Sequence, residues 1–298
     1  MQSQKVKGYI AAAISAISFG LIPLFVVPVK KAGISMDVTL FYRFFLGGVM
    51  IALYMVTRGI SLRLHRSDVP KLAAMGVFYA LSSEFLFQGY DLLTVGIAST
   101  LIYTYPIIIA VILYFCFGEQ ISPAAKLSIV LATAGVFCMS WEGGNLEFNL
   151  YGVIIVMLGS LAYALYMLMV NRGNLKVRGV SLTCYSLLFS SAFYAVKTLI
   201  TGQSFLLPST YWLGFIGGFS LITTVISVLA MVIAIQLIDS TPTAVLGALE
   251  PVVAVWIAII FFGEIVTWNL IAGVVLIISA LLVNILGARI RTLRSKYL

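Results

Sequence analysis

Ionisable side chains are rare in this sequence, and a few of them lie deep inside long apolar stretches. Glu84, Gln88 and Asp91 share one such stretch, and their spacing of i, i+4 and i+7 places them on one face of a helix. Glu250 and Arg43 lie inside two other stretches. An ionised group in apolar surroundings is costly, so it generally faces a partner or a water-filled cavity. These residues could therefore bind a polar solute or exchange a proton.

Tyrosines and hydroxyl-bearing residues in the same stretches could form the remaining walls of such a cavity. A tyrosine combines apolar surface with a polar tip, and a stripe of serines and threonines lies at residues 220–227. The alternative for each tyrosine is packing between helices. For each glutamate the alternative is a buried protonated carboxyl group or a structural ion pair with Arg43. The predicted substrate-binding residues are Glu84, Gln88, Tyr79, Tyr103, Tyr163, Tyr166, Ser227 and Glu250.

Arg43 could bind a substrate carboxylate through two N–H groups, although a structural ion pair is the favoured alternative. Glu119 and Glu264 each follow a glycine at the end of an apolar run, shortly before a residue that can cap a helix. A carboxylate near a helix N-terminus is stabilised by free N–H groups, so a structural role at the start of the next helix is favoured for both. The predicted gating or coupling residues are Arg43, Asp91, Glu119 and Glu264.

The composition excludes a soluble protein. Hydrophobic residues make up 62% of the 298 residues and charged residues 9%, against about half and about one quarter in soluble domains. The net charge of +8 is spread over short connectors rather than gathered in one patch, so it does not indicate nucleic-acid binding. The three cysteines lack paired spacing and the single histidine is isolated, so no metal or other cofactor is expected.

Ten apolar runs follow one another along the chain, most of them near the roughly 20 residues that a helix needs to cross a membrane. The predicted spans are 7–29, 37–57, 70–92, 95–117, 123–141, 150–171, 180–200, 211–237, 242–262 and 268–288. With the N-terminus inside, the inner segments hold fourteen lysines and arginines, whereas the outer connectors hold Lys30, Lys31 and Lys197. Because positive charge concentrates on the cytoplasmic side, both termini are expected in the cytoplasm.

One pattern occurs twice in the same register. PIIIAVILYFCFGE begins at Pro106 and PVVAVWIAIIFFGE begins at Pro251, so that the prolines, glycines and glutamates are each 145 positions apart. Ten spans divide into two sets of five, and because five is odd the second set must cross the membrane in the opposite sense. The predicted fold is therefore all-α, with ten transmembrane helices in two inverted-topology repeats, residues 1–145 and 146–298. Inverted repeats are typical of alternating-access transporters with a site near the midplane.

These motifs, with FYRFFLGG around Arg43 and LAYALYMLMVNR at residues 161–172, resemble the EamA-type ten-helix exporters of the drug/metabolite transporter superfamily. The resemblance covers essentially the whole chain. It implies a central cavity between the two halves, with the fifth and tenth spans more peripheral, in a bacterial inner membrane. It also implies export of amino acids or similar small metabolites.

The leading prediction is a secondary transporter that exports small metabolites, with amino acids expected, by alternating access. No phosphate-binding GxxxxGK[ST] motif is present, so ATP is not expected to drive it. Proton coupling through Glu84 or Glu250 and transport without coupling are both left open. The expected partners are a small-molecule substrate and membrane lipid, and the protein could act as a monomer. The alternatives are a carrier for nucleotide sugars, other organic solutes or drugs and, more remotely, a membrane enzyme or a channel.

Overall fold

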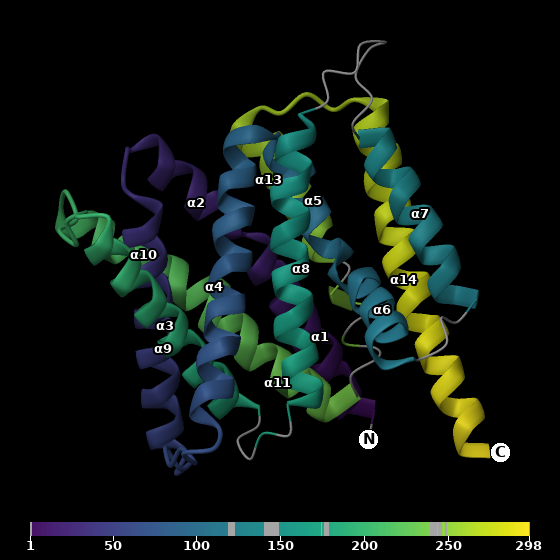
Figure 1. The fold of residues 1–298 in the computed structure, drawn as a ribbon, viewed down its shortest axis with the longest axis horizontal. Helices are drawn as coiled ribbons and strands as arrows, with labels where there is room; N and C mark the ends of the chain where they lie inside the picture. The colour runs from purple at the N-terminus through teal and green to yellow at the C-terminus, as the bar shows by residue number, and fades with distance from the viewer. Residues whose placement is uncertain are drawn as a thin grey trace.

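The computed structural model describes residues 2–118, 123–139, 149–173, 179–238 and 249–297, with positions 175, 243, 246 and 247. Within these residues every regular element is a helix. Figure 1 shows them as one bundle with both chain ends at the same end of it. The helices are α1 (Gln2–Gly20), α2 (Ile22–Lys31), α3 (Met36–Thr57), α4 (Val69–Leu92), α5 (Val95–Leu101), η1 (Ile102–Thr104), α6 (Tyr105–Phe117), α7 (Pro123–Met139), α8 (Leu150–Arg172), α9 (Val180–Ile200), α10 (Thr210–Ser220), η2 (Leu221–Ile226), α11 (Ser227–Ile238), α13 (Leu249–Phe262) and α14 (Trp268–Tyr297).

Several of these helical stretches have the length and apolar character needed to cross a membrane. A helix of about 20 apolar residues satisfies its own backbone hydrogen bonds inside the lipid layer. Apolar side chains also cover the outside of the bundle, as at Phe115 (76% exposed) and Ile200 (80% exposed). The chain is therefore a multi-pass, all-α membrane protein, and the number of ten crossings stays a prediction. The five stretches that meet both criteria are Gln4–Lys31, Met36–Thr57, Val95–Phe117, Leu150–Val170 and Thr210–Ile238.

Three of the predicted spans are irregular inside. The first is interrupted at Leu21, between Gly20 and a second helical segment that carries Pro23 in its first turn. The fourth contains one turn of 3₁₀-helix, η1, directly before the helix that begins with Tyr105 and Pro106. The eighth contains a π-helical stretch, η2. Such departures from α-helical geometry often occur at functional sites, and all three lie beside the cavity described below.

The repeated Gly-Glu pattern marks matching helix ends. Gly118 ends α6 with a φ of +66°, and Gly263 follows α13 with a φ of +69°. Only glycine adopts this left-handed conformation without strain, so it is the favoured residue just beyond a helix. The repeated glycine is thus explained by helix termination alone.

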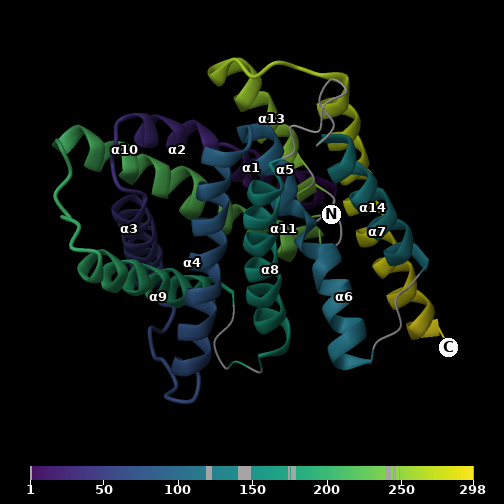
Figure 2. The same cartoon turned by 45° about the horizontal axis from the view of Figure 1, so that its top comes forward.

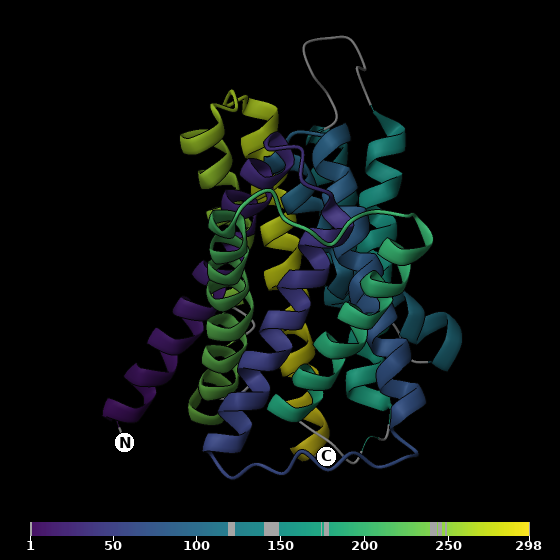
Figure 3. The same cartoon turned by 90° about the vertical axis from the view of Figure 1, so that its left-hand side faces the viewer.

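The helices pack in pairs that are equivalent under the register of the repeat. In each half, the first helix packs on the third helix of the other half, so α1 lies along α11 and α8 lies along α4. Gly8 permits close contact of α1 with Ile238, and Gly152 permits close contact of α8 with Leu93. Gly152 lies 144 positions after Gly8, and Ile238 lies 145 positions after Leu93. Figure 3 shows the chain start at one end of the bundle, and Figure 1 shows α8 beginning at the other end.

The two last helices of the halves, α7 and α14, pack mainly on each other. Figure 2 shows this pair at one edge of the bundle, with α6 between it and α8. The family resemblance implies such a peripheral position for the fifth and tenth spans. The remaining helices surround a cavity at the centre of the bundle.

Candidate functional site

The cavity has a volume of about 170 Å³ and is bordered by helices from both halves of the chain. Its wall is mostly apolar and aromatic, with a few polar groups, as is usual for sites that bind small molecules. Most of the residues predicted from the sequence to bind substrate lie on this wall. They are Tyr79, Tyr103, Tyr163, Tyr166, Ser227 and Glu250, and Arg43 joins them.

The tyrosines form a continuous aromatic surface on one part of the cavity. The ring of Tyr79 lies 5.1 Å from that of Tyr166 and 6.1 Å from that of Tyr163, measured between centroids. Tyr163 also meets Tyr105 edge to face at 4.6 Å. These rings come from α4, α6 and α8, which are distant in sequence except where the i, i+3 spacing joins Tyr163 and Tyr166. They present flat apolar surface and phenol oxygens to the cavity.

Arg43 is a buried cation at the cavity wall, with only 2% of its surface exposed. Its Nε donates to Thr224 Oγ1 at 3.4 Å, and its guanidinium lies 4.5 Å from the centroid of the Phe219 ring. Among the described residues no carboxylate forms an ion pair with it. The expected structural ion pair of Arg43 is therefore not present in this part of the chain. Its positive charge faces the cavity, and its described neighbours are a hydroxyl group and aromatic rings rather than a carboxylate.

The π-helical stretch η2 brings Thr224 to Arg43. Ser220, which precedes η2, donates its hydroxyl to the carbonyl oxygen of Arg43 at 2.6 Å. Gly47 on α3 allows the approach, because a Cβ there would lie 3.0 Å from Ser220 Oγ. The wider turn of a π-helix then directs Thr224 towards the guanidinium. The serine and threonine stripe was apparent in the sequence, whereas the π-helical geometry was not.

Glu250 supplies the negative charge of the cavity from the first turn of α13. Its carboxylate lies within hydrogen-bonding range of the Tyr103 phenol. The break in the first span is directly opposite: a Cβ at Gly20 would lie 2.8 Å from the carbonyl oxygen of Glu250. Glycine at this position therefore lets the first span approach α13 closely. Arg43 and Glu250 are the two charged side chains among the described residues that line the cavity.

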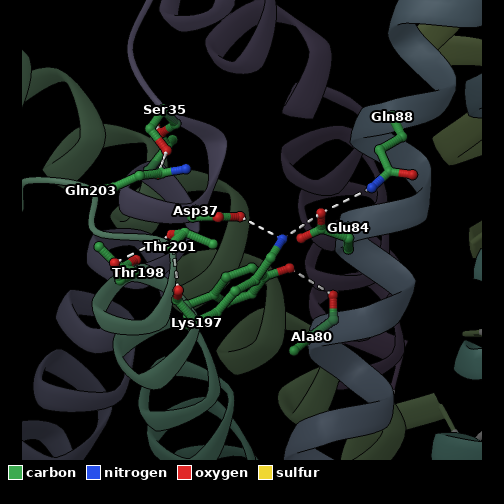
Figure 4. Close-up of polar contacts among 11 residues, drawn as sticks. Ser35, Asp37, Ala80, Glu84, Gln88, Lys197, Thr198, Thr201 and Gln203 are labelled. Atoms are coloured by element: carbon green, nitrogen blue, oxygen red, sulfur yellow. Dashed lines mark hydrogen bonds and ion pairs between the residues drawn. The ribbon is translucent and has the colours of Figure 1, made fainter.

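Glu84 and Gln88 lie outside the cavity wall, in a separate polar cluster between α3, α4 and α9 (Figure 4). Glu84 Oε1 accepts hydrogen bonds from Lys197 Nζ at 2.7 Å and from Gln88 Nε2 at 3.0 Å. Lys197 Nζ also lies 2.7 Å from Asp37 Oδ1. The structure thus differs from the prediction that Glu84 and Gln88 contact substrate. The difference arises because this face of α4 turns towards α9 rather than towards the centre.

Asp91 continues the same helical face but reaches its outer limit. Its carboxylate forms an ion pair with Lys30 at 2.6 Å, and 64% of its side chain is exposed. Lys30 Nζ also donates to the carbonyl oxygen of Phe87 at 2.5 Å. An exposed pair of this kind contributes little to stability. The stripe predicted on α4 is therefore divided between a buried cluster and a surface ion pair.

Glu264 caps a helix, but not the one expected. Its carboxylate accepts the backbone N–H groups of Val95 at 2.5 Å and Gly96 at 3.0 Å, at the start of α5. Burial raises the pKa of this carboxyl, whereas the two backbone hydrogen bonds lower it. The following helix α14 is capped instead by Thr267, whose Oγ1 accepts from the N–H of Leu270 at 3.1 Å. Glu119, the matching residue of the first repeat, lies outside the described residues.

We expect Glu264→Ala to lower the free energy of unfolding by about 1 kcal/mol, because two N–H groups of α5 would lose their acceptor. Glu264→Gln retains a side-chain oxygen that can accept these bonds, so its loss should be smaller. Thermal unfolding in detergent, followed by circular dichroism, measures the order of the two variants. Equal losses would argue that the charge of Glu264, rather than its role as acceptor, stabilises this end of the bundle.

Three important residues were not selected from the sequence as part of the site. Lys197 was assigned to an outer connector, although it lies in the last turn of α9 and points into the cluster with Glu84. Tyr194, one turn earlier, is fully buried and donates its hydroxyl to the Ala80 carbonyl oxygen at 2.9 Å. Tyr90 lines the cavity and is hydrogen-bonded to Ser99 at 3.1 Å. The need for a buried carboxylate to have a partner was the signal that could have identified Lys197.

Comparison with known proteins agrees with this architecture. The model of the EamA-like transporter family matches the chain twice, at residues 6–141 and 150–286. A solved crystal structure superimposes with a TM-score of 0.66 over 97% of this chain and 99% of the other, at 16% identity, which shows a shared fold.

Relatives similar in sequence carry transporter names without an assigned substrate. The uncharacterized transporter YvbV of Bacillus subtilis is 23% identical, covering 86% of each chain. An uncharacterized transporter of Archaeoglobus fulgidus is 24% identical over 93% of this chain and 95% of its own. The uncharacterized inner membrane transporter YedA of Escherichia coli K12 is 23% identical over 74% of this chain and 72% of its own. The two family matches span most of the sequence, and the predicted resemblance is thereby confirmed: the chain is a transporter rather than an enzyme, and it belongs to the EamA-like transporter family.

Proposed function

We propose that this transporter exports small zwitterionic metabolites, amino acids in particular, by alternating access around the central cavity. The observation that carries the proposal is that one buried cation, Arg43, and one half-buried carboxylate, Glu250, lie on the wall of the same cavity. A free amino acid has a carboxylate and an ammonium group, and each would find a partner of opposite charge there. The tyrosine surface beside Tyr79 suits an apolar or aromatic side chain.

Among the described residues Arg43 has no carboxylate partner, which favours a ligand with a carboxylate. A buried guanidinium without a carboxylate partner is costly, and a bound substrate carboxylate would remove that cost. Glu250 argues against a purely anionic ligand, because its charge would repel one. Together they disfavour the alternative of a nucleotide sugar or another strongly anionic solute.

The size of the cavity points in the same direction. About 170 Å³ is below the ~300–1,000 Å³ of sites that hold drug-sized ligands. A nucleotide sugar, with its base, two sugars and two phosphates, would need a much larger site. An organic cation would suit the tyrosines and Glu250 through cation–π contacts, but it would face the charge of Arg43.

Helix packing supports an inverted repeat as the basis of alternating access. The contact of Gly8 with Ile238 and the contact of Gly152 with Leu93 are equivalent in register and lie at opposite ends of the bundle. Two halves related in this way could close the cavity first towards one side and then towards the other. Both chain ends lie at one end of the bundle, which the distribution of basic residues assigns to the cytoplasm. A single chain encloses the cavity, so a monomer would suffice.

Counterflow in proteoliposomes tests the proposal. Vesicles that contain the purified protein are preloaded with one unlabelled amino acid at a time, and uptake of a labelled aromatic amino acid or of labelled threonine is followed. We expect uptake to be stimulated by at least one preloaded amino acid and to be absent from vesicles without protein. A folded protein that shows no stimulated uptake with any amino acid would overturn the substrate class. Preloading with nucleotide sugars and with organic cations would then identify the alternative.

A further inference from the structure

We propose that Glu84 is the proton-binding residue of this transporter and that it binds a proton outside the substrate cavity, in the cluster with Asp37 and Lys197. The inference rests on the proposed transport function and adds its coupling ion. It also assigns Glu84 and Glu250 to different tasks. Glu84 would bind the proton, and Glu250 would contact the substrate.

The charges of the cluster do not balance. Two carboxylates, Asp37 and Glu84, share one ammonium group, that of Lys197, at 2.7 Å each. The side chains of the two carboxylates are 9% and 14% exposed. If both are ionised, the cluster carries one net negative charge in mostly buried surroundings. One bound proton would make the cluster neutral.

The hydrogen bonds show where that proton would be held. Glu84 Oε1 accepts from Lys197 and Gln88, whereas Glu84 Oε2 is buried and has no hydrogen-bond partner among the described residues. The nearby Tyr194 hydroxyl faces this carboxylate, but its single hydrogen is donated to the Ala80 carbonyl oxygen at 2.9 Å. The Tyr194 oxygen retains lone pairs and can accept a hydrogen bond. A protonated Oε2 could donate to it, and so the neutral carboxylic acid would satisfy an atom that the carboxylate leaves unsatisfied.

The charged cluster lies at one end of a bundle whose helix packing repeats at the other end. In the register that relates Leu93 to Ile238, Glu84 corresponds to Leu229. In the register that relates Gly8 to Gly152, Lys197 corresponds to Leu53. The equivalents of Glu84 and Lys197 at the other end of the bundle are thus apolar, and that of Asp37 is the uncharged Ser181. Because helix packing is similar at both ends of the bundle without these charges, packing does not require them. Their presence at one end indicates a function that only this end of the transporter performs.

A chain of packed rings joins the cluster to the cavity. Tyr194 lies 5.9 Å from Phe44 between ring centroids, and Phe44 lies 5.4 Å from Tyr79 on the cavity wall. The helix that carries Glu84 also contributes to the cavity wall, through Ser82, Ser83, Leu86, Phe87 and Tyr90. A change of charge at Glu84 would alter its attraction to α9 and with it the position of α4 beside the substrate.

The titratable groups that the described residues bring close to Glu84 come from α3 and α9. Asp37 faces it from α3, and Lys197 and Tyr194 face it from α9. Lys30, beyond it, is paired with Asp91. In the proposed step a proton from water adds to Glu84 Oε2, and the O–H so formed donates to the Tyr194 oxygen. Coupling requires release to the water on the opposite side of the membrane, after the alternating-access change, and this release restores the carboxylate. Lys197, 32% exposed, lies where water reaches the cluster.

Substrate-driven proton movement tests the assignment. Proteoliposomes with a pH-sensitive dye inside receive an amino acid that shows counterflow. The wild-type protein should move protons with it. Glu84→Gln, which imitates the protonated side chain, should keep counterflow but lose proton movement, and Tyr194→Phe should weaken proton movement. Ser35→Ala is the matched control, because it removes a neighbouring hydrogen bond with Gln203 and leaves Glu84 untouched. It should retain both activities.

Two results would overturn the inference while the transport function stands: counterflow without proton movement in the wild type, or proton movement that survives in Glu84→Gln. Loss of proton movement in Glu250→Gln alone would move the assignment to the cavity. A protein without amino-acid counterflow would refute the proposed function instead. Glu84 would then be tested by infrared difference spectroscopy on acidification. A protonated-carboxyl band that is present in the wild type and missing in Glu84→Gln supports the assignment, and its absence from the wild type refutes it.

Discussion

Replacing Arg43 by glutamine is expected to raise the KM for amino-acid counterflow at least about 30-fold, or about 2 kcal/mol, because a buried charge pair with the substrate carboxylate would be lost. The same change should leave the apparent melting temperature unchanged or higher. Arg43 is buried without a carboxylate partner among the described residues, so its removal relieves a cost rather than breaking an ion pair. A structural role would give the opposite result, a fall in stability.

A substrate without a carboxylate makes this test specific. The wild-type protein should transport the decarboxylated amine of its amino acid about 30-fold less well, since the amine lacks the group that Arg43 binds. The Arg43→Gln variant should no longer distinguish the two compounds. Equal losses for both compounds in this variant would mean that Arg43 shapes the cavity without binding the carboxylate.

Two further variants separate charge from geometry. Arg43→Lys keeps the positive charge but lacks the planar pair of donors, so it should recover only part of the affinity. Arg58→Gln removes an exposed arginine at the end of the same helix, where the guanidinium lies over the Tyr54 ring, and should behave as wild type. If Arg58→Gln were as defective as Arg43→Gln, a general effect of positive charge on α3 would be the simpler explanation.

Helix positions were largely predictable because residues close to each helix end determine where the helix begins and ends. The spans predicted at 150–171 and 180–200 correspond to α8 and α9 within one residue at each end. Asn149 caps the first by accepting from the N–H of Gly152 at 2.9 Å, and Gly179 precedes the second. Such signals act within a few residues, so they can be recognised in a single sequence.

The contacts of Glu84 were not predictable in the same way. Its spacing with Asp91 correctly placed both on one face of α4, but the spacing does not say which helix that face meets. Its partners Asp37 and Lys197 are separated by 160 positions and come together only because α3 packs on α9. The tyrosines, by contrast, were correctly located at the cavity. In both cases residue type indicated a buried polar or aromatic role, and only tertiary packing decided where.

The charge of Glu250 should determine whether the cavity accepts an ammonium group. We expect Glu250→Gln to lower kcat/KM for an amino acid at least about 30-fold, or about 2 kcal/mol, through loss of a buried charge pair. The deaminated acid of the same carbon skeleton should not be affected, because it has no ammonium group to bind. It could even be transported better, since the variant no longer repels an anion. Glutamine keeps an oxygen that can accept from Tyr103, so the shape of the site is retained.

Tyr103→Phe distinguishes the charge of Glu250 from its position. Loss of one hydrogen bond to the Glu250 carboxylate should cost about 1.5 kcal/mol, or roughly 10-fold in kcat/KM, for either substrate. Glu250→Gln and Tyr103→Phe should therefore differ in selectivity and not only in size of effect. If Glu250→Gln reduced transport of the amino acid and of the deaminated acid equally, Glu250 would be needed for movement or packing of α13, whose backbone contacts Gly20, rather than for recognition of the ammonium group. If Glu250→Gln reduced transport of the amino acid more than that of the deaminated acid, and Arg43→Gln showed the inverse preference, then Glu250 would bind the ammonium group and Arg43 the carboxylate of one zwitterion.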